Sequence, residues 1–197
     1  MTLPSAQLAT DLLVWWDEHG RHDIPWKQAN ASGQPDPYGI WIAEVMLQQT
    51  QLQVALPYWQ RWMEALPTVE ALAAADEHQV LLLWQGLGYY SRARRLHQAA
   101  QQLRGQPWPQ DLEAWLALPG IGRSTAGSIL SSAFDRPFAI LDGNVKRELA
   151  RLTAFEHPPA RHSAHFWSLS EQLLDWQRPR DFNHALMDLG ATLCTPR

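Results

Sequence analysis

Apolar residues recur at helical spacing along almost the whole chain. They are typically three or four positions apart, and no segment alternates apolar and polar residues over the length of a strand. The connections between these segments are short and often contain proline. Helices are predicted at 5–19, 38–49, 51–65, 68–74, 77–84, 89–104, 111–117, 123–133, 143–152, 163–176 and 181–192. We therefore predict an all-α fold.

Two prolines bear on where helices begin and break. Asp36 precedes Pro37, which is typical of an N-cap aspartate followed by a first-turn proline. Pro57 lies inside the predicted helix 51–65. Because proline has no backbone N–H group, it should kink or split that helix.

Composition limits the class of protein. With 197 residues, 46% of them apolar, the chain can bury one core or two closely packed lobes. Its 11 tryptophans are spread along the sequence, so most are expected to anchor the core. No apolar run approaches the roughly 20 residues that span a bilayer, and the first residues lack the pattern of a signal peptide. We expect a cytoplasmic monomer with no membrane partner.

Charge is unevenly distributed. The net charge of −4 argues mildly against a nucleic-acid partner, but the distribution of charge matters more than the sum. Arg92, Arg94 and Arg95 are clustered, and Arg123 and Lys146 flank the motifs described next. This clustering is compatible with a local basic face, and a solvated helix face explains it equally well.

A Gly-Xaa-Gly hairpin at residues 118–122 is the most informative local pattern. Gly120 and Gly122 precede a helix that starts with small residues. Such glycines let a phosphate approach the backbone, and the N–H groups at the helix start point at it. About 20 residues later, Asp142 stands at another predicted helix start. A phosphate clamp beside an acid indicates an enzyme acting on nucleic acid. An ordinary helix–turn–helix with a capping aspartate is the alternative.

A series of motifs in this order resembles the helix-hairpin-helix DNA glycosylases and, among them, the adenine-specific mismatch glycosylases (MutY). The motifs lie at residues 22–26, 37–38, 41–50, 83–90, 118–122, 141–147 and 182–190. The resemblance implies a two-lobed helical fold, with one lobe at 27–137 and the other combining 1–26 with 138–197. It also implies that double-stranded DNA lies across the cleft between the lobes, which would hold the active site.

The resemblance further implies hydrolysis of the N-glycosidic bond of adenine mispaired with guanine or 8-oxoguanine, in base excision repair. This reaction needs a proton on the leaving base and a negative charge beside the oxocarbenium-like sugar. Glu44, whose apolar neighbours should keep it protonated, is the candidate acid. Asp142 is the candidate carboxylate, and Asn144 matches a family residue that hydrogen-bonds near the sugar. The alternatives are that Glu44 faces solvent and that Asp142 only caps a helix.

Further site residues follow from the resemblance alone. Tyr89 is expected to be exposed and to insert beside the base opposite the adenine. Contacts to DNA are expected from Gln48, Gln49, Leu87, Tyr89, Gly120, Gly122, Ser124 and Lys146. The base pocket is expected to contain Trp26, Lys27 and His184, and a monovalent cation to bind the carbonyls of Leu116, Leu118 and Ile121. Buried glutamines, a core tyrosine and a solvent-exposed lysine are the competing interpretations.

Ser124 separates a simple glycosylase from a lyase. The endonuclease III relatives carry a lysine at this position, and its amine attacks the sugar and leads to strand cleavage. A serine hydroxyl cannot form that imine, so we expect a monofunctional glycosylase. Two alternatives stay open: a lyase of the endonuclease III type, and a non-catalytic module that binds distorted duplex DNA.

Cys194 departs from the family pattern. It is the only cysteine, whereas in the family a cysteine at this place is the first of four that hold a [4Fe–4S] cluster. One thiolate cannot hold the cluster, and we expect no counterpart of the family domain that reads 8-oxoguanine within these 197 residues. We expect either a fragment or a naturally clusterless form. The stretch 28–34 is longer than the family leads us to expect, and His184 stands where members often have Gln or Glu.

Overall fold

The computed structural model describes residues 5–30 and 33–196, and regular structure in these ranges is helical. The helices are α1 (Ser5–His19), η1 (Pro25–Lys27), α2 (Pro37–Leu47), α3 (Leu52–Ala65), α4 (Val69–Ala74), α5 (Glu77–Trp84), α6 (Ser91–Leu103), α7 (Leu112–Leu116), α8 (Arg123–Phe134), α9 (Gly143–Leu152), η2 (Pro159–Arg161), α10 (Ser163–Leu173) and α11 (Pro179–Thr192). The described ranges contain one isolated β-bridge and no strand. The prediction of an all-α fold is confirmed.

Helix ends differ from the prediction where side chains compete with the backbone. Asp36 caps α2 by accepting hydrogen bonds from two amides, as predicted. The helix predicted to reach residue 176 ends at Leu173, because Asp175 accepts hydrogen bonds from the amides two and three residues later (2.8 Å each). Of the kink or split predicted at Pro57, the split does not occur, since α3 runs through this residue, and the kink stays a prediction. Because Pro57 has no N–H group, the carbonyl of Gln53 lacks its usual helical hydrogen bond. Gln53 is exposed, so water can solvate that carbonyl.

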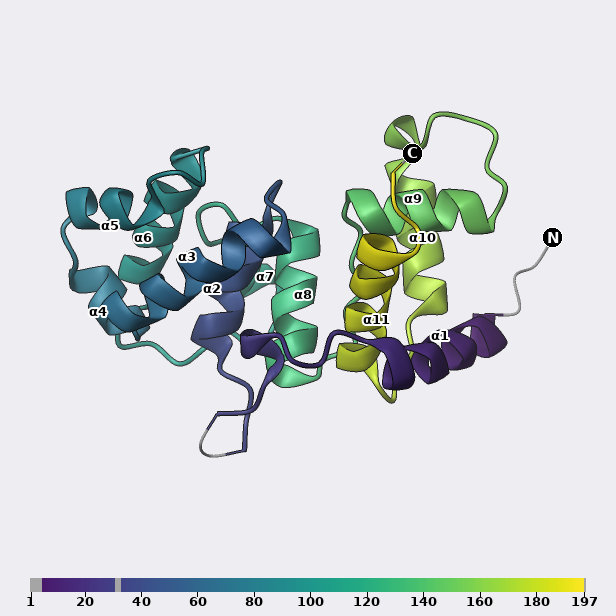
Figure 1. Ribbon diagram of the computed structural model, residues 1–197, viewed down its shortest axis with the longest axis horizontal. Helices are drawn as coiled ribbons and strands as arrows, with labels where there is room; N and C mark the ends of the chain where they lie inside the picture. Colours follow the sequence, from purple (N-terminus) through teal and green to yellow (C-terminus); the bar gives the residue numbers. More distant parts are fainter. Residues whose placement is uncertain (1–4, 31–32, 197) are drawn as a thin grey trace.

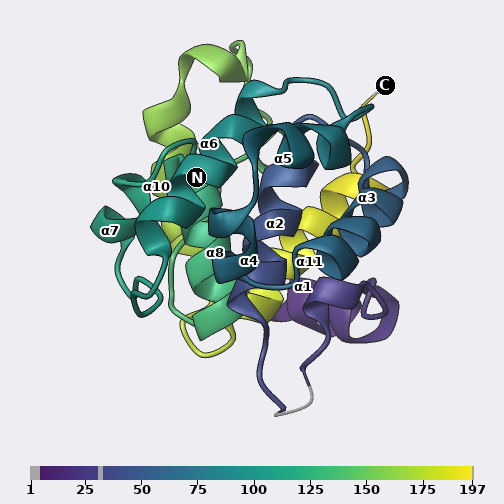
Figure 2. The same ribbon diagram turned by 90° about the vertical axis from the view of Figure 1, so that its left-hand side faces the viewer.

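Buried apolar side chains form two main clusters. The large core lies among α2 to α8 and contains the fully buried Trp41, Trp62, Trp84 and Trp115. The small core lies among α1, α9, α10 and α11. Figure 1 shows the two groups of helices side by side, and Figure 2 shows the first group end-on, in front of the second. Most tryptophans are at least partly buried, as predicted, and Trp176 is the exception.

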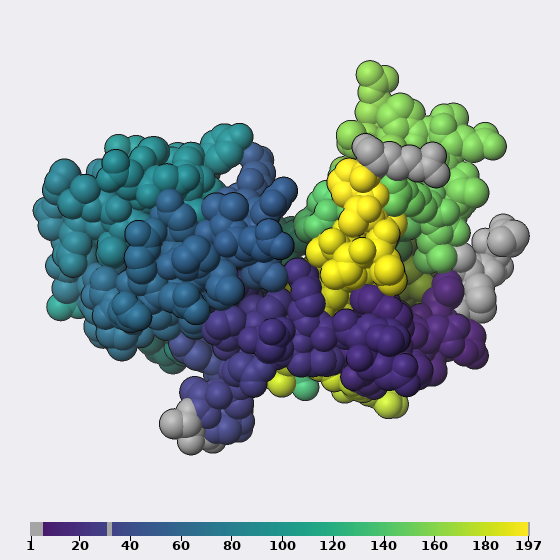
Figure 3. All heavy atoms as spheres, in the orientation of Figure 1, coloured from purple at the N-terminus to yellow at the C-terminus, as the bar shows by residue number. Residues whose placement is uncertain are grey.

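The two groups meet along α8 and α11. These helices pack against each other at the centre of Figure 1. A third, small cluster joins the segment after α1 to α2 and α8 through Ile24, Trp26, Ile40, Ala43 and Ala133. Above this junction, Figure 3 shows a notch between the two halves of the molecule. No helix in the described part of the chain is long and apolar enough to cross a membrane.

Candidate active site

Glu44 lies on α2 in an apolar setting. Its neighbours Ala43 and Val45 are buried, and its own side chain is half-buried. Burial raises the pKa of Glu44 to about 7, the negative charge of Asp142 adds to this rise, and the Ser128 hydroxyl opposes it. A carboxyl group with this pKa is partly protonated at neutral pH and can donate a proton.

Asp142 is exposed and caps the start of α9. Its carboxylate accepts a hydrogen bond from Val145 N at 2.8 Å. The preceding residue, Leu141, donates its amide to Ser124 Oγ at 3.0 Å, which ties the start of α9 to the start of α8. Because α2 packs against α8 and the Asp142 charge acts on Glu44, the two candidate catalytic carboxyls share one site. The interpretation of Asp142 as a cap also holds, since one carboxylate can serve both roles.

The hairpin has the backbone that its glycines predict. Gly120 adopts φ +83°, and a Cβ atom there would lie 3.0 Å from Arg95 Cβ. Gly122 is the N-cap residue of α8, and no side chain caps that helix. The first amides of α8 are therefore not satisfied by a capping side chain and can bind an anion. At the predicted cation site, the Leu118 carbonyl already accepts a hydrogen bond from Ile121 N (3.3 Å), and cation binding there stays a prediction.

Four of the residues expected to contact DNA lie in two loops, the loop after α2 (residues 48–51) and the loop after α5 (residues 85–90). Gln48 donates to Thr125 Oγ1 at 3.2 Å, which joins the end of α2 to α8. Gln49 is exposed with φ +59°. Tyr89 is 65% exposed with φ +47°, so its expected exposure is confirmed. Leu87 is buried in the large core, and its side chain does not reach the surface. In Figure 1 the loop after α2 and the start of α9 lie on the side where Figure 3 shows the notch.

Arg92 holds these two loops together, a role that the sequence did not reveal. The interpretation of Arg92 as part of a basic or solvated face was wrong, because its side chain is buried. Its guanidinium donates hydrogen bonds to the carbonyls of Val45, Met46, Gln48, Leu87 and Gly88. It also lies 5.2 Å from the ring centroid of Trp84 and 5.6 Å from that of Tyr89. The carbonyls at a helix C-terminus carry partial negative charge, which a buried cation stabilises.

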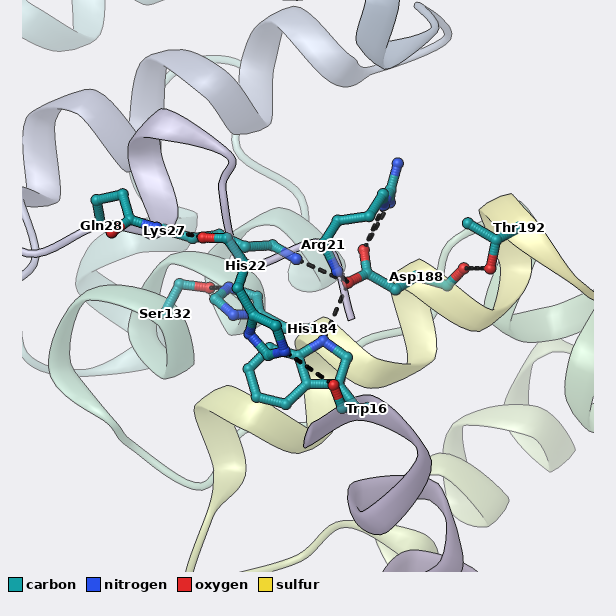
Figure 4. A network of polar contacts seen from close by, with 9 residues as sticks. All are labelled: Trp16, Arg21, His22, Lys27, Gln28, Ser132, His184, Asp188 and Thr192. Atoms are coloured by element: carbon teal, nitrogen blue, oxygen red, sulfur yellow. Dashed lines mark hydrogen bonds and ion pairs between the residues drawn. The ribbon is translucent and has the colours of Figure 1, made fainter. Parts of the chain in front are cut away.

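Two of the three residues expected in the base pocket, Lys27 and His184, lie in a polar network drawn in Figure 4, and the third, Trp26, is buried beside it in the small apolar cluster. Lys27 Nζ lies 2.9 Å from Asp188, and only 7% of its side chain is exposed. His184 hydrogen-bonds Ser132 Oγ at 3.0 Å, and burial lowers its pKa to about 3, so its ring is neutral. Trp26 packs against Trp59, with ring centroids 5.4 Å apart.

Asp188 is the centre of this network. Its side chain is 1% exposed and accepts hydrogen bonds from Trp16 Nε1 (3.0 Å), Arg21 N (2.9 Å), Arg21 Nε (2.8 Å) and Lys27 Nζ. Burial alone would raise the pKa of Asp188, but Lys27 and Arg21 outweigh burial and lower it. The network joins α1 and the segment after it to α11. The sequence places Asp188 in a motif but contains no signal for its partners.

The polar residues Asn144 and Lys146 of α9 are partly exposed, and both hydrogen-bond to neighbouring side chains. Asn144 Oδ1 accepts a hydrogen bond from Arg147 Nη2 at 3.1 Å. Lys146, expected to contact DNA, donates to Ser163 Oγ of α10 at 2.9 Å.

Cys194 does not fit an iron–sulfur cluster. Its sulfur accepts a hydrogen bond from Arg151 at 3.1 Å, and its carbonyl accepts one from Arg147 at 2.8 Å. A cubane needs four thiolates and the chain has one cysteine. In the described ranges, no three His, Cys, Asp or Glu side chains are grouped so that they could hold a metal ion. The residues present therefore do not form the cluster site that the resemblance implies.

Comparison with known proteins places these features in a family. Residues 42–172 match the model of the HhH-GPD superfamily base excision DNA repair protein. Adenine DNA glycosylase from Mus musculus is 44% identical over 197 residues, covering 95% of this chain and 38% of that protein. Adenine DNA glycosylase from Buchnera aphidicola subsp. Schizaphis graminum is 36% identical, covering 94% and 54%. This chain thus spans from about two fifths to about half the length of these relatives.

Solved structures show the same fold. A thermostable thymine-DNA glycosylase superimposes with a TM-score of 0.84 at 27% identity, covering 98% of this chain and 88% of that chain. An endonuclease III in a non-covalent DNA complex superimposes with a TM-score of 0.78 at 18% identity, covering 100% and 90%.

Proposed function

We propose that this chain hydrolyses the N-glycosidic bond of adenine in DNA. The chain belongs to the HhH-GPD superfamily of base excision DNA repair proteins, and this membership is the premise of the proposal. The single observation that supports this most is the pairing of Glu44, whose pKa is raised to about 7, with the exposed carboxylate of Asp142. The names of the relatives support adenine as the base. We propose adenine opposite guanine or 8-oxoguanine in double-stranded DNA as the substrate, and a monomer as the active form.

The two carboxyls divide the reaction between them. The adenine must leave the helical stack to reach them. Glu44 then donates its proton to adenine N7 as the bond from C1′ to N9 breaks, and Asp142 stabilises the positive charge that develops on the sugar. Water adds to C1′ and gives its proton to the Glu44 carboxylate, which restores the acid. No strand is cut in this sequence.

The remaining site residues suit binding of a bent duplex. The uncapped start of α8 can take a backbone phosphate, and the exposed Gln49 and Tyr89 can enter the duplex where a base has left it. The lobes proposed at 27–137 and at 1–26 with 138–197 would then grip the DNA on both sides of the notch. The buried Lys27 and His184 would form the floor of the base pocket.

The test of this proposal is release of free adenine from three duplexes that differ only in the base opposite the adenine. We expect release from A·G and A·8-oxoguanine duplexes and little from an A·T duplex. A wild-type protein that binds mismatched DNA but releases no more adenine than a Glu44→Gln variant would instead be a non-catalytic binder of distorted DNA.

A second prediction concerns strand cleavage. The chain has two lysines, Lys27 and Lys146, and the structure engages both, with Asp188 and with Ser163. Ser124 accepts the Leu141 amide and cannot form an imine. Borohydride added during the reaction should therefore trap little covalent protein–DNA adduct. Full-strength trapping that disappears in Lys27→Arg or Lys146→Arg would support a lyase of the endonuclease III type.

A further inference from the structure

A buried carboxyl without a role so far lies on α9: Glu148, six residues after Asp142. Glu148 is 6% exposed, and neither of its carboxyl oxygens has a hydrogen-bond partner in the described part of the chain. Burying a carboxyl without a partner is costly, and it is tolerated best when the group is uncharged. The reaction described above does not use this residue.

Gly190 of α11 makes the space for this carboxyl. A Cβ atom at residue 190 would lie 2.1 Å from Glu148 Oε1 and 2.8 Å from Asn144 Cβ. Glu148 and Asn144 are four residues apart on α9 and therefore share a face of the helix. Side chains on a helix tilt toward its N-terminus, so Glu148 points toward Asn144 and the start of α9.

Arg147 completes this contact between the two helices. Its Nη2 atom donates to Asn144 Oδ1 at 3.1 Å and to the Gly190 carbonyl at 2.9 Å. We call the four residues Asn144, Arg147, Glu148 and Gly190 the α9–α11 seam. Glu148 is the member of the seam whose polar atoms have no partner, although Arg147 is adjacent to it in sequence.

We propose that Glu148 is a positioning residue for adenine excision: its uncharged carboxyl lets Arg147 hold Asn144, and an ionised Glu148 would draw Arg147 away. The proposal rests on the function proposed above. It makes excision depend on two acids, Glu44 at the base and Glu148 beneath Asn144.

Burial keeps the Glu148 carboxyl mostly uncharged at neutral pH. Burial raises its pKa to about 8, the Asp142 charge adds to this rise, and Arg147 opposes it. The elements packed against α9 are α10, α11 and η2, and their titratable groups include Arg161 of η2, His165 of α10 and His184 of α11. Four further charged side chains on these helices are paired with groups other than Glu148. Those paired are Asp188 of α11 with Lys27 and Arg21, Asp181 of α11 with Arg178, Arg180 of α11 with the Ser132 carbonyl, and Glu171 of α10 with Arg123.

The test is the pH dependence of single-turnover adenine release in wild type and Glu148→Gln. At about pH 6.5 the two rates should agree within about threefold. Above about pH 8.5 the wild-type rate should fall by up to about 100-fold per pH unit, because both acids ionise, and the variant rate by about tenfold. Glu113→Gln, an exposed substitution on α7, is the matched control and should follow wild type. A variant profile that overlays an active wild type would overturn the role of Glu148.

A second measurement does not depend on catalysis. A group whose folded pKa is raised binds more protons in the folded than in the unfolded state, so stability is lost as pH rises toward the folded pKa. Between about pH 5 and pH 8, the unfolding equilibrium constant of wild type relative to Glu148→Gln should rise by about tenfold per pH unit. Equal pH dependence in urea unfolding would contradict a buried, uncharged Glu148. Wild-type protein that shows this rise but releases no adenine would contradict the function itself, and the role of Glu148 with it.

Discussion

Replacing Glu44 by glutamine should slow adenine release from an A·G duplex by about 10²- to 10⁴-fold, the usual contribution of a general acid. Glutamine has nearly the same shape but no proton of suitable acidity. The half-buried site should accept it, because burial already favours the uncharged form of Glu44. Binding of the mismatched duplex, measured separately, should change little.

The pH profile gives this prediction a second readout. Because the pKa of Glu44 is raised to about 7, the acid form is lost as pH rises, and the wild-type rate should fall above about pH 7. The residual activity of Glu44→Gln should lack that part of the alkaline fall which comes from Glu44. Glu64→Gln, at an exposed position on α3, is the control and should behave as wild type. Full activity in Glu44→Gln would exclude this residue as the acid.

Replacing Asp188 by alanine should lower the free energy of unfolding by about 3–5 kcal/mol, the cost of removing one partner from a buried ion pair. The Asp188 side chain is 1% exposed, and that of its ion-pair partner Lys27 is 7% exposed. The substitution also leaves Trp16 Nε1 and the Arg21 amide without their acceptor. Urea unfolding at neutral pH measures the loss.

A double variant separates the buried charge from the packing. Lys27→Met combined with Asp188→Leu removes both charges and should be more stable than Asp188→Ala, because no cation is left uncompensated. Glu18→Gln, on the exposed side of α1, should cost little. Because the pKa of Asp188 is lowered, its contribution should be present at neutral pH and lost as the solution becomes strongly acidic. A loss below about 1 kcal/mol in Asp188→Ala would show that the network contributes little.

Several features of the fold could be predicted from local sequence. The predicted helices 77–84 and 143–152 coincide with α5 and α9, because apolar spacing and N-cap aspartates act within one or two turns. The raised pKa of Glu44 could also be anticipated, since its apolar neighbours on α2 already mark a buried helix. The hairpin glycine Gly120 was recognisable because its backbone conformation favours glycine.

The sequence by itself therefore determined the helices, their caps and the kind of residue available for chemistry. Only the tertiary structure decided which of these residues are buried and what they contact. From the sequence, Arg92 was predicted to lie on a basic or solvated face, yet it binds carbonyls inside the large core. Lys27 was expected near the base pocket, with solvent exposure as the alternative, and the structure pairs it with Asp188, 161 residues away. The sequence around Glu148 does not distinguish it from other polar helix residues, and its burial becomes visible only in the structure, where Gly190 of α11 packs against it. Burial and pairing depend on groups brought in from distant segments, and local periodicity contains no information about which segments those are.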